Sequence, residues 1–407
     1  MDSEKKQVTA LVAIEGERLP EPRRTSYWTR IAGKYTVLWR ALLVVLVLFA
    51  VLFMLVFSRA FTYDSLFCFF KDLQMVTAFV PSDYATVSTT YEEGGYTALA
   101  YRGGIAFVNT GGIEVYSPDG RRLLDVDLAL KSPNAVASRK YLIAYDSGGT
   151  TFTVTNSYTE LFRSETDFPI YGAEVSDSGH FALITASDEV LSQVLLYDNN
   201  FNLIQRFHRA SATVGVSVSD NGRQIALLGI AATEGTARTV LDVYQLGKSA
   251  PAYSLSFEQE LPLSVGFTNN RHLTVLTDKA LRSCDLDGEI EAQMPLDGMP
   301  IAFTVNGEGA ALVLETEQIE STHRVIVLDK RGALLYDGTL DRDVSAVALG
   351  SDEVFLLAGN EALRIDTDKQ QQTAIAIESG ATGIFAVDSG RIRVVYPAKV
   401  EYLSFEA

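Results

Sequence analysis

Short apolar runs recur along the chain from about residue 98 onward, and each follows a tight turn rich in Gly, Asp, Asn or Ser. The eight runs are IAFVN, YLIAY, FALIT, IALLGI, LTVLT, AALVLE, VFLLA and IRVVY. Continuous apolar runs of this length are typical of strands buried on both faces. The pattern therefore predicts β-structure throughout this region.

A polar hairpin is the second recurring feature. VYSPDGRRLLDVDL, from Val115, consists of two strand-like runs joined by Ser-Pro-Asp-Gly. The same layout returns in LLYDNNFNLIQRF, SCDLDGEIEAQMPL, VLDKRGALLYDGTL and RIDTDKQQQTAIAI. Turns of this composition between strand-like runs signal antiparallel hairpins. Each repeated unit is therefore expected to contain four short antiparallel strands.

The repeat spacing indicates a β-propeller. Units begin near residues 98, 133, 171, 212, 262, 300, 344 and 381. Four short strands in roughly forty residues match one propeller blade, and packing blades face to face in a ring covers faces that one small sheet leaves open. We therefore predict an all-β fold over residues 85–407, a propeller of eight four-stranded blades, with seven blades as the alternative and a β-sandwich as the runner-up.

The ends of this region predict how the ring closes. The eighth unit ends with KVEYLSFEA, where earlier units turn into a fourth strand. Residues 85–91, ATVSTTY, are strand-like and belong to no unit. We expect this N-terminal strand to complete the last blade, because pairing the two ends of the domain leaves no open edge there.

A single transmembrane α-helix is predicted over residues 35–59. Residues 41–57 are all apolar, and Arg40 and Arg59 bracket them. With the residues before Arg40, the run approaches the twenty or so that a bilayer core requires. Basic residues are concentrated on its N-terminal side, so the positive-inside rule places the N-terminus in the cytoplasm and the propeller outside. A cleaved signal peptide is the alternative, since Ser58 and Ala60 suit a peptidase.

The segments on either side of this helix complete the domain prediction. Residues 1–34 are polar and show no sustained periodicity, so we expect a disordered cytoplasmic tail. Residues 60–84 are predicted to form a membrane-proximal amphipathic helix and linker, because apolar positions form a stripe within residues 62–77.

The charge balance narrows the possible partners. The formal net charge is −17, and residues 1–59 hold nine Lys and Arg against five Asp and Glu, so the acidic excess lies in the predicted propeller. Such a domain repels nucleic acid and other extended polyanions. Nucleic acid is therefore excluded as a partner.

No catalytic, cofactor-binding or metal-binding residue is predicted. Asp285 to Gly288 resembles the start of a calcium loop but lacks the third oxygen ligand and the distal Glu, so a hairpin turn is the better interpretation. Both cysteines, Cys68 and Cys284, are interpreted as apolar packing residues. The four histidines are interpreted as turn or strand-end residues; they are His180, His208, His272 and His323.

Three links between second and third strands are longer than the others. They are residues 231–239, 186–192 and 315–323. We expect these polar segments to be flexible loops that project from one face of the ring, where they could form a binding surface.

The chain resembles domain of unknown function family 5711, whose members are membrane-anchored proteins of Gram-positive, mainly clostridial, bacteria. The resemblance rests on the helix followed by TYDSLFCFFKDLQ, on YRGGIAFVNTGGIEVYSPDGRRLL, and on the pair IYGAEVSDSGHFALITASDEVLSQVLLYD and VSVSDNGRQIALLGIAATEGTARTVLDVYQ. It covers nearly the whole chain past residue 35. It implies a bacterial cytoplasmic membrane as the location, and it implies no assigned activity.

The leading functional hypothesis is a membrane-tethered, extracytoplasmic propeller that acts as a non-enzymatic binding or scaffold module for another envelope protein or component. No cofactor is expected. The alternative is a propeller enzyme, a hydrolase or lyase, with its site in the central channel. A third hypothesis is signalling, in which the cytoplasmic tail reports what the propeller binds.

Overall fold

The computed structural model describes residues 34–35, 37–49, 86–88, 95–233, 235–315 and 322–405. The chain divides into two compact units, residues 1–78 and 79–407. The predicted tail apart from its last residue, and the whole of the predicted membrane-proximal segment, lie outside the described residues.

In the first unit, residues 34–35 and 37–49 are helical. Residues 50–59 of the predicted membrane helix lie outside the described part of the chain. Among the described residues, no helix combines the length and apolar character needed to cross a membrane.

The described strands of the second unit form eight four-stranded antiparallel sheets, as predicted. Blade 1 contains β2 (Tyr96–Tyr101), β3 (Gly104–Asn109), β4 (Gly112–Tyr116) and β5 (Arg122–Asp127). Blade 2 contains β6 (Pro133–Ala137), β7 (Leu142–Asp146), β8 (Thr151–Thr155) and β9 (Glu160–Glu165). Blade 3 contains β10 (Ile170–Val175), β11 (Phe181–Thr185), β12 (Ser192–Tyr197) and β13 (Leu203–Arg209). Blade 4 contains β14 (Ala212–Val218), β15 (Gln224–Thr233), β16 (Thr236–Gln245) and β17 (Tyr253–Glu258).

The remaining blades follow the same order. Blade 5 contains β18 (Pro262–Phe267), β19 (Leu273–Thr277), β20 (Ala280–Cys284) and β21 (Ile290–Pro295). Blade 6 contains β22 (Met299–Asn306), β23 (Gly309–Glu315), β24 (His323–Asp329) and β25 (Leu334–Leu340). Blade 7 contains β26 (Val344–Leu349), β27 (Glu353–Ala358), β28 (Glu361–Asp366) and β29 (Gln371–Ala376), and blade 8 contains β30 (Gly383–Asp388), β31 (Arg391–Val395), β32 (Lys399–Ser404) and β1 (Val87–Ser88).

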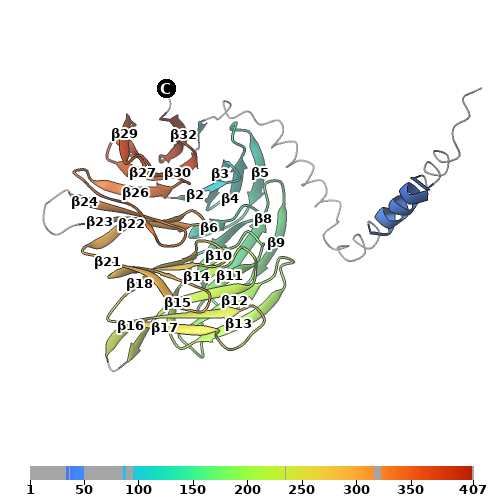
Figure 1. Cartoon of the computed structure of the whole chain (residues 1–407). Coiled ribbons are helices and arrows are strands. Elements are labelled where there is room, and N and C mark those ends of the chain that lie inside the picture. The colour runs from blue at the N-terminus through green and yellow to red at the C-terminus, as the bar shows by residue number, and fades with distance from the viewer. Residues whose placement is uncertain are drawn as a thin grey trace, which may run out of the picture. The chain divides into compact units, whose positions relative to one another are not determined.

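The blades form a ring in which the first strand of each blade is innermost. First strands of successive blades contact one another from β2 to β30, and Figure 1 shows them around the centre with fourth strands such as β9 and β13 at the rim. Because strands within a blade are antiparallel, the ring has two distinct ends. We define the turn end by the turns that join first to second and third to fourth strands, and the loop end by the remaining connections.

The ring closes as the sequence predicted. In blade 8 the strand order is β1-β32-β31-β30, so the outermost strand comes from the N-terminal side. Val87 pairs with Val400, and Ser88 pairs with Lys399. Val87 also belongs to a buried apolar cluster that includes Phe107 of blade 1. The last and first blades are therefore joined by strand pairing and by a shared core.

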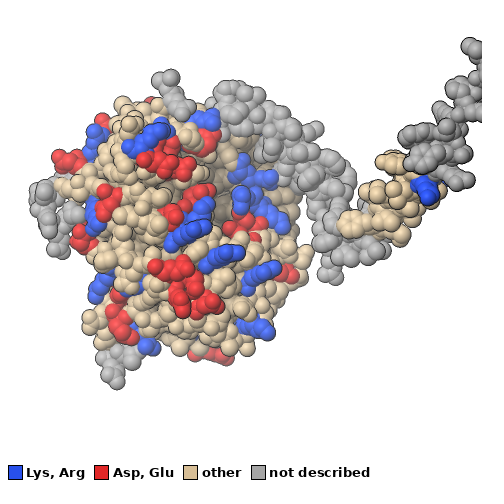
Figure 2. All heavy atoms as spheres, in the orientation of Figure 1, with Lys and Arg blue, Asp and Glu red and all other residues tan. Residues whose placement is uncertain are grey.

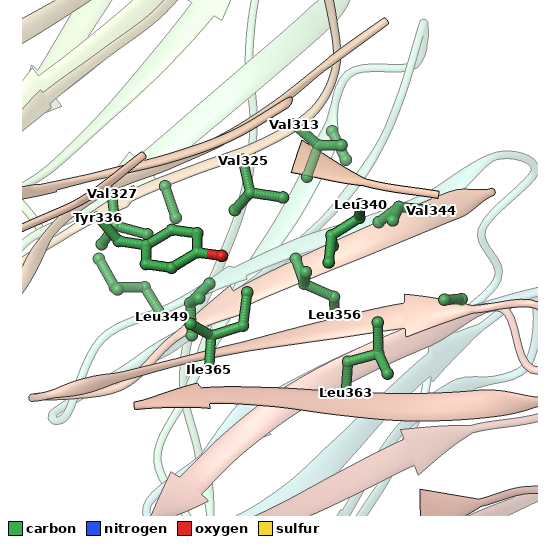
Figure 3. Packing of buried hydrophobic residues seen from close by; sticks show 14 residues of the cluster. Val313, Val325, Val327, Tyr336, Leu340, Val344, Leu349, Leu356, Leu363 and Ile365 are labelled. Atoms are coloured by element: carbon green, nitrogen blue, oxygen red, sulfur yellow. The ribbon is translucent and has the colours of Figure 1, made fainter. Parts of the chain in front are cut away.

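Packing between blades builds the core. The second strands β3, β7, β11, β19 and β27 are buried along their whole lengths, which explains their continuous apolar runs. Figure 3 shows one interface, where Val325 and Tyr336 of blade 6 lie opposite Leu356 and Ile365 of blade 7. Burial of large aliphatic side chains on both faces stabilises the ring by about 1.5–3 kcal/mol for each side chain.

One sequence prediction about loops is wrong. Residues 231–239 were expected to form a flexible loop, but they continue β15 and β16 as a regular hairpin in which Ala231 pairs with Arg238 and Thr233 pairs with Thr236. The β-branched residues of TARTV, Thr236, Thr239 and Val240, favour strand pairing despite the polar composition of the segment. The 186–192 link is a loop up to its last residue, and residues 316–321 lie outside the described residues.

Candidate functional site

The first strands of blades 3 to 7 share a β-bulge near the loop end. Their pairing with the second strand shifts register between Ile170 and Gly172, Thr213 and Gly215, Pro262 and Ser264, Pro300 and Ala302, and Val344 and Ala346. The extra residue in each bulge is Tyr171, Val214, Leu263, Ile301 or Ser345. A bulge leaves its extra residue outside the ladder and redirects that side chain.

The bulged residues are apolar in four consecutive blades, and three of them are exposed. Tyr171 is 62% exposed, Val214 is 49% exposed and Ile301 is 39% exposed. Met299 and Phe303, on either side of Ile301 in β22, are 69% and 38% exposed. Because first strands are innermost and begin at the loop end, these side chains surround the opening of the central channel there. We call this group the loop-end mouth.

Two loop residues extend the apolar character of this end. Leu261, which precedes β18, is 47% exposed, and Leu191, in the loop before β12, is 66% exposed. Exposed large apolar side chains that gather in one region of a soluble surface mark sites of association with other macromolecules. The loop-end mouth is therefore the candidate functional site.

Exposed acidic side chains also lie at the loop end of the ring. Six exposed carboxylates at the loop end of blades 2, 3 and 6 form no ion pair with any described residue. This acidic rim consists of Glu165, Asp188, Glu189, Glu315, Asp341 and Asp343. An apolar centre within an acidic rim complements a ligand that is apolar and basic.

An innermost strand also carries one carboxyl group with an altered pKa. Glu174 lies in β10. The equivalent positions in the first strands of the next three blades are Ser217, Gly266 and Thr304. Burial raises the pKa of Glu174 to about 8, and the nearby carboxylate of Asp220 contributes in the same direction. The Glu174 carboxyl group forms no hydrogen bond or ion pair with another described residue. This carboxyl group therefore keeps its proton to a higher pH than an exposed glutamic acid does.

The structure agrees with the sequence in giving Asp285 a turn role. Its Oδ1 accepts hydrogen bonds from the backbone N–H groups of Asp287 and Glu289, at 2.9 and 2.8 Å. Within the described residues, no three His, Cys, Asp or Glu side chains are arranged to hold a metal ion. The interpretation of this motif as a hairpin turn is confirmed.

Three histidines are held by local contacts. His180 Nδ1 lies 3.0 Å from Ser178 Oγ, and His272 Nε2 lies 2.9 Å from Glu291. His323 Nδ1 lies 2.7 Å from the Arg342 carbonyl, whereas His208 is exposed on β13. These positions in turns and at strand ends match the sequence interpretation.

The cysteines divide between the described and undescribed parts of the chain. Cys284 in β20 is fully buried, and burial raises the pKa of its thiol to about 11. A thiol in this state is a packing residue, because the thiolate is the reactive form. Cys68 lies outside the described residues.

The sequence did not reveal the loop-end mouth. Its signal is a single apolar residue beside Gly, Pro or Ser at the start of a first strand, as in IYG, TVG, PLS and PIA. This signal cannot be recognised before strand register is known, because an apolar residue in a first strand normally indicates the core.

The chain is similar to several solved structures. An eukaryotic initiation factor structure aligns with a TM-score of 0.53 at 13% identity, covering 77% of this chain and 85% of that one. BamB from Moraxella catarrhalis aligns with a TM-score of 0.49 at 11% identity, covering 80% of this chain and 97% of that one. The Swd1 β-propeller domain from Myceliophthora thermophila aligns with a TM-score of 0.48 at 14% identity, covering 78% of this chain and 98% of that one. At such identities the likeness concerns the fold alone.

The model of the family of unknown function DUF5711 matches residues 80–405. A search of curated proteins finds no significant match.

Proposed function

Because the chain belongs to the family of unknown function DUF5711, its role has to be inferred from its own structure, and we propose that the propeller is a non-enzymatic binding module for another protein. The observation that carries this proposal is the loop-end mouth, where bulges direct Tyr171, Val214 and Ile301 outward. A ring of rigid strands holds these side chains before any partner arrives. Such preorganisation reduces the entropy lost on binding.

The charge of the rim indicates the chemistry of the partner. The acidic rim repels acidic surfaces and attracts Lys and Arg, while the mouth offers apolar area at its centre. We therefore propose that the partner inserts a segment with bulky apolar side chains flanked by basic residues.

We also propose a location for this interaction. The helical residues 37–49 continue into the apolar run up to residue 57, which suits a membrane anchor, and basic residues precede it. In this arrangement the propeller is tethered outside the bacterial cytoplasmic membrane and the partner is another envelope protein. The cytoplasmic tail is free to report binding.

The test is crosslinking in intact cells, followed by recovery of the full-length protein and mass spectrometry. The informative variant carries Met299→Glu and Ile301→Glu, which place charges in the mouth. Leu334→Glu is the matched control, because Leu334 is 50% exposed on the outer strand of the same blade. The proposal expects one partner that is recovered with the wild type and the control and lost with the mouth variant. The same proteins recovered with all three, or none with any, would contradict it.

The enzyme alternative has one observation in its favour, the raised pKa of Glu174 on the innermost strand of blade 3. A carboxylic acid with a pKa of about 8 suits general acid catalysis. A hydrolase or lyase also needs a second group within reach of the substrate. Hydrolysis of model esters or glycosides by the purified protein, abolished by Glu174→Gln, would establish this alternative.

A further inference from the structure

Most arginines of the propeller are paired with acids. Twelve of the described arginines form ion pairs with Asp or Glu; they are Arg121, Arg122, Arg139, Arg163, Arg206, Arg209, Arg238, Arg282, Arg324, Arg342, Arg364 and Arg391. On the face drawn in Figure 2, basic and acidic side chains accordingly lie interleaved. In a chain with net charge −17, an arginine without an acidic partner is an exception that requires an explanation.

Three exceptions gather at the turn end of blades 4 to 6. Arg223 and Arg271 lie in the turns between first and second strands of blades 4 and 5, and Arg331 lies in the outer turn of blade 6. Their guanidinium groups form no hydrogen bond or ion pair with any residue that the structure describes. All three are exposed.

These three arginines line two adjoining hollows. One hollow, of about 650 Å³, is lined by Arg271, Arg331, Lys330, His272, Glu291 and two asparagines. The other, of about 660 Å³, is lined by Arg223, Arg271, Asn221, Asn270, Gln224, Gln245 and three further residues, none of which is acidic. Arg271 and Asn270 line both hollows, so the two hollows lie side by side.

Hydrogen bonds between blades hold the walls of these hollows in place. The Asn270 side chain accepts the Asn221 N–H at 2.9 Å, which joins blades 4 and 5. Asn269 Nδ2 and Thr268 Oγ1 both donate to the Lys330 carbonyl, at 2.9 and 2.8 Å, which joins blades 5 and 6. The arginines therefore extend from a rigid frame rather than from mobile loops.

We infer that this turn-end site binds a compact ligand that carries two or more phosphate groups. Guanidinium groups match phosphate oxygens in pairs, and uncharged Asn and Gln amides around them donate to further oxygens. The acidic excess of the propeller disfavours a long polyanion at a distance, whereas a short ligand that lies between the two hollows meets mainly the local positive charge. This site lies at the opposite end of the ring from the loop-end mouth, so it is independent of the proposed function.

Calorimetry with the full-length protein in detergent tests the inference. The probes are orthophosphate, pyrophosphate and tripolyphosphate, and affinity should rise along this series and fall with added salt. Arg271→Ala should weaken tripolyphosphate binding about tenfold or more, because Arg271 contacts both hollows. Arg271→Lys should restore only part of the affinity, because Lys lacks the paired donors.

Arg121→Ala is the matched control. It removes an exposed arginine from the same end of blade 1, where Asp119 already pairs with it, and binding should not change. Ile301→Glu should likewise leave phosphate binding intact. Equal affinities for the Arg271→Ala and Arg121→Ala proteins, or no binding of any soluble probe, would overturn the inference. Binding only to phosphatidylglycerol vesicles, and not to phosphatidylcholine vesicles, would overturn the compact ligand and assign the phosphates to a lipid surface.

Discussion

The Arg393 guanidinium donates a hydrogen bond to the Gly103 carbonyl across 290 positions of sequence, at 3.3 Å. The same Nη2 donates to the Pro118 carbonyl, also at 3.3 Å. Arg393 is 1% exposed in β31 of blade 8, and both carbonyls belong to turns of blade 1. A buried side chain therefore reinforces the closure that β1 and β32 make through their backbones.

Arg393→Ala should destabilise the propeller by about 2–4 kcal/mol, because it leaves a cavity and removes charged hydrogen bonds. Arg393→Met should cost less, since it refills most of the volume. Urea unfolding followed by circular dichroism measures both. Equal stabilities of the two variants would contradict the prediction that the cavity left by Arg393→Ala contributes to the loss.

Glu260→Gln should destabilise the protein by about 3 kcal/mol, because it leaves a buried guanidinium without its carboxylate. Arg282 Nη1 and Nη2 each lie 2.7 Å from a Glu260 oxygen, and the Arg282 guanidinium lies 4.1 Å from the Phe257 ring centre. The double variant Glu260→Leu with Arg282→Met should recover most of the loss. A double variant less stable than Glu260→Gln would contradict this.

The Glu260 pair should also make stability depend on pH. Burial alone raises the pKa of Glu260, but hydrogen bonds from Arg282 and Thr277 outweigh it, so the pKa lies below its usual value. Glu260 makes its full contribution to the free energy of unfolding above the pKa of about 4.3 that it has in the unfolded chain. This contribution is lost as the pH falls through the pKa that Glu260 has in the folded protein. The stability difference between wild type and Glu260→Gln should therefore shrink below pH 4, in unfolding curves recorded from pH 7 to pH 3.

Glu174→Gln should stabilise the protein at alkaline pH. The pKa of Glu174 is raised to about 8 by burial and by Asp220, so the folded state retains a proton that the unfolded chain releases near pH 4.3. The wild type should lose stability progressively from about pH 4.3 to pH 8, and the variant should lose less. Thermal unfolding at pH 5, 7 and 9 measures the difference, with Glu165→Gln as an exposed control. Parallel profiles for wild type and Glu174→Gln would contradict the burial of this acid.

Gly332→Ala should destabilise more than Gly247→Ala. Both glycines have positive φ, 84° and 81°, so each substitution strains the backbone by about 1–2 kcal/mol. A Cβ on Gly332 would lie 2.6 Å from Ser283 Cβ and 3.1 Å from Ala292 Cβ in blade 5, whereas a Cβ on Gly247 meets nothing within 4 Å. Overpacking should add about 1–3 kcal/mol at Gly332 alone. Chemical denaturation measures the loss of stability. Equal losses for the two variants would contradict the prediction, because they would mean that the contact of Gly332 with blade 5 can relax at no energetic cost.

The sequence by itself determined the repeat, the strand order and the closure. Second strands are buried on both faces, so their apolar runs are visible without any knowledge of neighbours, and polar turns such as Ser117 to Gly120 mark the blade edges. The strand at Val87 could be assigned to the last blade because the last repeated unit lacked a fourth strand. The repeat follows from local patterns, whereas the closure, which joins Val87 to Val400, follows from counting strands per unit.

The tertiary structure alone decided where function can reside. In the sequence, Tyr171 and Ile301 look like core residues. In the structure, a one-residue register shift directs them to the channel opening. The register depends on pairing between strands, which the sequence pattern does not show. Arg223, Arg271 and Arg331 are separated by 108 positions from first to last and look like ordinary turn arginines. Only the packing of blades 4, 5 and 6 brings them to shared hollows, because contacts between blades follow from ring geometry rather than from any local pattern.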